Sequence, residues 1–130
     1  MDTVKYMNNW LESAERDLKT ADSLFLNAKY DWCLFIGHLV IEKALKALYM
    51  KKKNIAPPKT HNLIGLTENL EIHLTEEQIV LLSRISDFNI DARYPNEKDS
   101  FHNLCTKEFT REYLGKIKEI YRWLLLQIKQ

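Results

Sequence analysis

The sequence contains little of what several protein classes require. It has three glycines in 130 residues, too few for a glycine-rich loop around phosphates, and it lacks the G-x-x-x-x-G-K-[ST], G-x-G-x-x-G, G-x-S-x-G and H-E-x-x-H patterns. Long apolar runs are also absent. The uncharged stretch from Trp32 to Ile41 is about half of the ~20 residues that a membrane helix needs. We therefore expect no membrane association, and none of the nucleotide-binding, hydrolase or metalloprotease sites that depend on these motifs.

Cysteine is rare, with two residues, and the four histidines do not cluster. Cys33 and Cys105 have no C-x-x-C spacing, which favours reduced core thiols in a cytoplasmic protein. The first residues, MDTVKYMNNW, lack the pattern of a secretion signal. The four histidines are scattered among the cysteines without the spacing of metal ligands. The sequence thus predicts a cytoplasmic protein with neither a metal site nor a cofactor.

Charge is balanced overall but not locally. Nineteen basic and 18 acidic residues give a net charge of +1, which excludes a uniformly basic surface for nucleic acid. Residues 43–59, however, contain six lysines and no acid, whereas residues 66–99 contain three basic and eight acidic groups. This asymmetry can steer an anion locally or orient two chains. The alternative for Lys51, Lys52 and Lys53 is a solvated helix end that suits the helix dipole.

Apolar residues recur three and four positions apart through most of the chain, and no segment has the alternation of a strand. Pro57 and Pro58 separate the helices before and after them. We predict one all-α domain over residues 1–130, an up-and-down bundle of about five helices with two long antiparallel ones. The expected helices are Thr3–Ala28, Asp31–Lys53, His61–Glu71, Thr75–Phe88 and Thr106–Lys129.

Several helix ends have recognisable capping residues. Asp31 and Thr60 are candidate N-caps, and Thr75 with Gln78 fits a capping box. Residues 91–103 show neither helical nor strand periodicity, so a long ordered loop is expected there, and such loops are often functional.

The second helix carries two apolar stripes. One neighbour cannot cover both, so this helix should lie centrally in the bundle or also meet a second chain. Gly37 lies inside it at a cost of about 1 kcal/mol in helix propensity, which predicts a close helix crossing.

Three groups of polar residues can carry chemistry. His38, Glu42 and Lys46 form a line at four-residue intervals, with Lys43 beside it; the alternative is a simple Glu42–Lys46 ion pair. The connector supplies Lys59-Thr60-His61, a cation, a hydroxyl and an imidazole.

The third group, Arg93-Tyr94-Pro95, places a guanidinium beside an aromatic ring and suits a phosphate or a base. The alternative is an arginine that holds helix carboxylates such as Asp87 or Asp91.

The chain resembles the HEPN family (higher eukaryote and prokaryote nucleotide-binding domain). The resemblance implies an all-α bundle that dimerises, binds a nucleotide or RNA, and is often encoded beside a minimal nucleotidyltransferase as a toxin–antitoxin pair. The matching motifs are Ala14-x-x-Asp17-Leu18-x-x-Ala21, Glu42-Lys43-Ala44-Leu45-Lys46-Ala47-Leu48, Thr60-His61-x-Leu63 and Ala92-Arg93-Tyr94-Pro95.

Ribonucleases of this family carry an arginine followed, after four to six residues, by a histidine. Here the next histidine after Arg93 is His102, which follows after eight intervening residues, and Arg84 has no histidine at the family spacing. The leading hypothesis is a phosphate-binding accessory protein with Arg93 and Tyr94 among its ligand-binding residues. The alternatives are a metal-independent ribonuclease using Arg93 and His102, and an interaction module without a ligand. The other predicted binding residues are Lys43, Lys46, Lys59 and His61.

Overall fold

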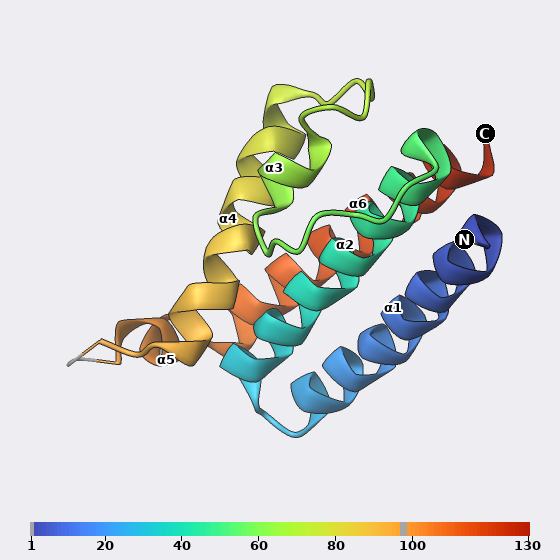
Figure 1. Ribbon diagram of the computed structural model, residues 1–130. Helices are drawn as coiled ribbons and strands as arrows, with labels where there is room; N and C mark the ends of the chain where they lie inside the picture. The colour runs from blue at the N-terminus through green and yellow to red at the C-terminus, as the bar shows by residue number, and fades with distance from the viewer. Residues whose placement is uncertain (1, 97–98) are drawn as a thin grey trace.

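The computed structural model describes residues 2–96 and 99–130. These residues form an all-helical bundle without strands (Figure 1), which confirms the predicted fold class. Four helices are long and two have five residues each. The helices are α1 (Thr3–Leu26), α2 (Tyr30–Lys53), α3 (Leu63–Thr67), α4 (Glu76–Arg93), α5 (Ser100–Leu104) and α6 (Lys107–Lys129).

Helix α2 is the centre of the bundle. It packs against α1, with which it forms an antiparallel pair, and also against α3, α4, α5 and α6 (Figure 1). A Cβ atom at Gly37 would come within 2.7 Å of Ile117 Cδ1 on α6, so the glycine marks the predicted close crossing. The two apolar stripes of α2 are therefore buried within one chain.

The capping predictions are partly right. Thr75 and Gln78 form the expected capping box at the start of α4. Asp31 is not an N-cap, because α2 begins at Tyr30 and places this carboxylate in its first turn, where it still interacts favourably with the helix dipole. Thr60 is not a helix cap either. Asn62 caps the short α3 by accepting from the Gly65 amide.

The predicted loop over residues 91–103 is wrong in part. Helix α4 continues to Arg93, and Ser100–Leu104 form α5; Glu97 and Lys98 of this segment lie outside the described residues. Phe101 of α5 packs 5.4 Å from Phe88 between ring centroids. A single helical turn held by one such contact has no periodicity to detect, which is why pattern analysis missed it.

Cys33 and Cys105 are buried and free, as predicted. Burial raises the pKa of each thiol to about 12, so neither is a nucleophile. Among residues 2–96 and 99–130, no helix combines the length and the apolar character needed to cross a membrane.

Candidate anion-binding site

One face of α2 organises most of the candidate residues. Asp31, Phe35, His38, Glu42 and Lys46 follow one another at intervals of four, three, four and four residues, so they share one side of the helix. We call these five residues the α2 stripe. Its members contact side chains from α1, the connector before α3, α4 and α5. The stripe thus collects chemistry from segments far apart in the sequence.

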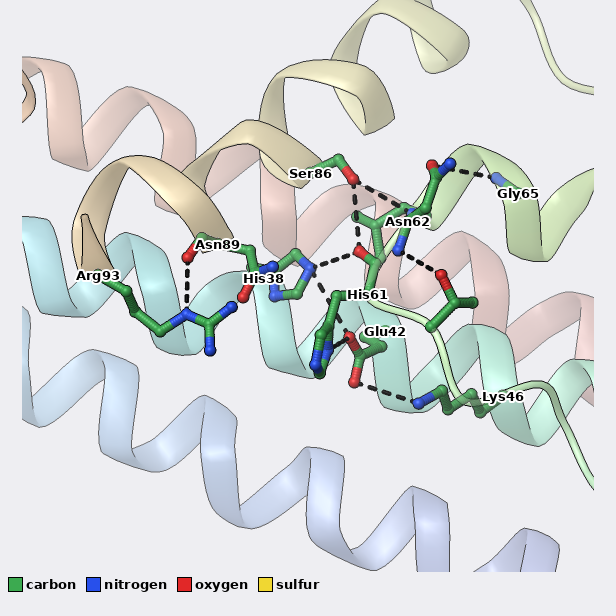
Figure 2. A network of polar contacts seen from close by, with 11 residues as sticks. His38, Glu42, Lys46, His61, Asn62, Gly65, Ser86, Asn89 and Arg93 are labelled. Carbon is green, nitrogen blue, oxygen red and sulfur yellow. Dashed lines mark hydrogen bonds and ion pairs between the residues drawn. The ribbon is translucent and has the colours of Figure 1, made fainter.

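Glu42 is the centre of a polar network in the middle of the stripe (Figure 2). Its side chain is 5% exposed, and its oxygens lie 2.6 Å from His61 Nδ1 and 3.4 Å from Lys46 Nζ. The sequence offered the Glu42–Lys46 pair as the alternative to a binding role for these residues, and it did not indicate that His61 would bond the same carboxylate. A buried carboxylate bonded to an ammonium and to an imidazole nitrogen meets the general requirement that buried charge be paired.

His38 fixes the backbone of the connector. The ring is fully buried and its Nε2 lies 3.1 Å from the His61 carbonyl oxygen, which Ser86 Oγ also approaches at 3.4 Å. Burial lowers the pKa of His38 below its ordinary value, against the opposing effects of the bond to the His61 carbonyl and of the nearby Glu42 carboxylate. The neutral ring therefore donates Nε2–H to the carbonyl and positions His61.

His61 combines a fixed backbone with an accessible side chain. Its side chain is 56% exposed, although Nδ1 is bonded to the buried Glu42 carboxylate. A histidine oriented by a carboxylate through one nitrogen presents the other nitrogen in a defined direction. Nε2 of His61 therefore accepts a proton when the ring is neutral and donates to an anion when the ring is protonated.

Arg93 lies at the end of α4 and is exposed. Its Nε donates to the Asn89 carbonyl oxygen at 3.0 Å, and its guanidinium carbon lies 5.8 Å from the centre of the Phe35 ring and 5.4 Å from that of Tyr94. Within the described part of the chain, no ion pair with Asp87 or Asp91 involves Arg93; Asp91 pairs with Arg84 at 3.6 Å. As far as residues 2–96 and 99–130 are concerned, the two terminal nitrogens of Arg93 are available for a bidentate contact.

His102 approaches the same face of α2 from α5. Its Nδ1 lies 3.3 Å from Asp31 Oδ2, and its side chain is 62% exposed. Asp31 precedes Phe35 by one helical turn, and Phe35 supports Arg93. Arg93 and His102 therefore lie against neighbouring positions of one stripe, each with its own partner.

The predicted lysines have different surroundings. Lys43 bonds Asp17 at 2.6 Å and Ser13 at 2.7 Å on α1. Lys46 is 7% exposed, bonded to Glu42 and 5.3 Å from the Trp10 ring centre, so it supports the network from inside.

Other basic groups lie further along. Lys59 is exposed. Lys51 bonds the carbonyl groups of Ile128 and Gln130 near the end of α6. Lys43 and Lys46 are paired with carboxylates and Lys51 with carbonyl groups, so the lysine-rich segment is partly bonded within the chain, which its sequence pattern does not reveal. Among the described residues no group of three or more His, Cys, Asp or Glu side chains is arranged to hold a metal ion.

Sequence analysis missed Asp31 as the partner of His102 and Phe35 as the support of Arg93. The signal was available, because both residues continue the helical spacing that joins His38, Glu42 and Lys46. Their partners come from α4 and α5, however, and no local pattern connects those segments to α2.

By its fold the protein is an all-helical bundle whose central helix, α2, bears the candidate site on one face. The HEPN domain model matches residues 7–128, nearly the whole chain, so the protein belongs to the HEPN family. The crystal structure of TT1696 from Thermus thermophilus has the same fold, with a TM-score of 0.79 and 21% sequence identity over 93% of this chain and 97% of that one. No curated protein matches the sequence. Membership supports a function of the family's kind, related to nucleotides or RNA.

Proposed function

We propose that this protein binds a phosphate group of a nucleotide or RNA at the α2 stripe, through Arg93 and His61. The observation that carries the proposal is that an exposed guanidinium, tethered by Nε to the Asn89 carbonyl, and an exposed imidazole oriented by buried Glu42 both lie against one face of α2. The arginine supplies a fixed charge and two donors, and the histidine a third donor when protonated.

The surrounding charges keep this site local. Asp31 and Glu42 lie on the same stripe, so the face is not broadly attractive to polyanions. Lys59 is exposed near His61 in the sequence and adds a cation on a long side chain. Lys43 and Lys46 act as supports of α1 and of Glu42, respectively. Binding should therefore depend on specific donors, with a modest dependence on salt.

Titration with nucleotides and short RNAs, followed by calorimetry, tests the proposal. Arg93→Ala should weaken binding tenfold or more, about 1.4 kcal/mol, because it removes the bidentate donor. Arg122→Ala, at an exposed position of α6, is the matched control and should bind like the wild type. Binding that is absent, or equal in the two variants, would refute the proposed site.

We also propose that the protein forms a homodimer. The apolar faces of α2 are covered within the chain, but a groove of about 720 Å³ remains between α4 and α6. Val80 in this groove is 68% exposed and the adjacent Ile79 44%. Acidic Glu76 and Glu77 lie at the groove together with basic Arg84 and Lys116, so two copies related by a two-fold axis can pair opposite charges there.

Light scattering of the wild type and of Val80→Glu tests the dimer. The variant should be monomeric at a concentration where the wild type is dimeric, because a carboxylate in place of an exposed valine must lose its hydration when the two copies meet. A monomeric wild type at high concentration contradicts the proposal.

Family membership further supports action in the cytoplasm beside a minimal nucleotidyltransferase, as one half of a toxin–antitoxin pair. Co-purification of the full chain with such an enzyme from the same genome tests this partnership. A complex that survives gel filtration supports it, and separate elution of the two proteins excludes a stable partnership.

RNA cleavage is the second candidate function, favoured by the placement of Arg93 and His102 against neighbouring turns of α2. In this reaction a 2′-oxygen attacks the adjacent phosphorus and the P–O5′ bond breaks. Histidine accepts the 2′-hydroxyl proton, the arginine stabilises the phosphorane charge, and the 5′-oxygen takes a proton from water. Cleavage in the presence of EDTA should disappear in both Arg93→Ala and His102→Ala. Cleavage that survives both changes would exclude this assignment.

A further inference from the structure

Two aromatic side chains flank the guanidinium of Arg93, and a third packs against one of them. We call Trp32, Phe35 and Tyr94 the aromatic cluster. Arg93 lies over the rings of Phe35 and Tyr94, and Trp32 contacts Phe35 edge to face, with 5.5 Å between ring centroids. Trp32 is 45% exposed and Tyr94 67% exposed. Large ring surfaces thus remain open to solvent beside a cation.

A role in packing the core does not explain why aromatic residues occupy these positions. Trp32 and Tyr94 belong to neither of the two clusters that form the core or its covering layer. Exposed aromatic surface that adjoins a polar site is typical of a binding surface. Bases of single-stranded nucleic acid stack on such rings and on arginine, whereas the bases of a duplex are already stacked on one another.

Three nitrogen-bearing side chains beside the cluster follow one line along α2. His102 is bonded to Asp31, Arg93 lies over Phe35, and His61 is bonded to Glu42. Asp31 and Glu42 are eleven residues apart, which corresponds to roughly 16 Å along the axis of α2. A mononucleotide cannot reach both ends of such a line, but a strand of about five stacked nucleotides spans it.

We propose that the α2 stripe and the aromatic cluster form a track for a short single strand of RNA. One backbone phosphate lies at the proposed site of Arg93 and His61, another lies at His102, and bases stack on Trp32 and Tyr94. This inference rests on the proposed phosphate site at Arg93 and extends it from one phosphate to a strand. Stacking on the rings would add affinity without recognising the identity of the bases, so binding should tolerate different RNA sequences.

The test measures fluorescence anisotropy of a labelled single-stranded RNA hexamer with the full-length protein. The hexamer should bind at least tenfold more tightly than a mononucleotide or than a duplex of equal length. Trp32→Leu and Tyr94→Leu should each weaken hexamer binding about tenfold, since each removes one stacking surface. Tyr6→Leu, which changes a 49% exposed aromatic on α1, should leave binding unchanged.

An abasic hexamer with the same phosphates separates the rings from the charges. It should bind weakly and equally to the wild type and to Trp32→Leu. Equal affinity of the wild type for the mononucleotide and the hexamer, with Arg93→Ala still harmful, would overturn the track and leave the phosphate site intact. Failure to bind any nucleotide or RNA would overturn both. A change of oligomeric state in Trp32→Leu and Tyr94→Leu with unchanged RNA binding would assign the cluster to a contact between chains and overturn the track.

Discussion

Removal of the Glu42 carboxylate should destabilise the fold through Lys46. The two side chains are 5% and 9% exposed and 3.4 Å apart, so Glu42→Leu leaves a buried ammonium without its anion. Breaking a buried pair from one side costs about 3–5 kcal/mol. The contact between Lys46 and the Trp10 ring persists and offsets part of this cost, so we expect about 3 kcal/mol. For a domain of this size that is a decrease of roughly 10 °C in Tm.

A double variant makes this reasoning refutable. Glu42→Leu with Lys46→Met removes both charges and should recover about half or more of the lost stability, because the uncompensated charge, and not the missing pair, causes most of the loss. Glu112→Leu breaks the exposed pair with Lys116, 3.2 Å apart, and should cost only a few tenths of a kcal/mol. Urea unfolding of the four proteins provides the measurement. A single variant within about 1 kcal/mol of the wild type, or a double variant no more stable than the single, would refute the argument.

Three further changes probe the supporting structure. Gly37→Val should cost about 1–3 kcal/mol in urea unfolding, because its Cβ meets Ile117 at 2.7 Å, and Ile117→Val in the same chain should relieve part of it; additive losses would contradict the close crossing. Thr75→Ala should lower the unfolding free energy by about 1 kcal/mol through loss of the capping box with Gln78, and an unchanged Tm would show that the cap is dispensable. The lowered pKa of His38 means that the unfolded chain binds the proton first, so stability should fall as pH drops below about 6.5 by at most about 1.36 kcal/mol per pH unit. His38→Gln should flatten this dependence in urea melts between about pH 7.5 and 5.5, and an equally steep profile in the variant would assign the effect to other groups.

The sequence predicted local features well where the cause was local. The capping box at Thr75 depends on two side chains three residues apart, and the Glu42–Lys46 pair depends on one helical turn. Predictions failed where a distant contact decides the outcome. Asp31 became a partner of His102 instead of a cap, because α5 packs against the start of α2.

For the candidate site, too, residue types could be read from the sequence, whereas contacts between distant segments could not. Arg93 and His61 were identifiable from the sequence because their residue types suit an anion and because their motifs resemble those of HEPN proteins. Their partners on α2 were not identifiable from the sequence. Phe35 and Arg93 are 58 residues apart in the chain, and Glu42 and His61 are 19 residues apart. Lys43 and Lys46 looked similar to Lys59 in sequence, but packing placed their ammonium groups against Asp17 and Glu42.

By itself the sequence determined the helical class, the long helices and the family, because helical periodicity and capping act between residues a few positions apart. Tertiary structure alone decided which charges remain exposed. Helix α2 brings side chains from α1, the connector, α4 and α5 to one stripe, and its packing separates the basic groups held inside the bundle from those exposed to solvent. The reason is that burial and pairing are properties of contacts between distant segments, which the linear order of residues does not specify.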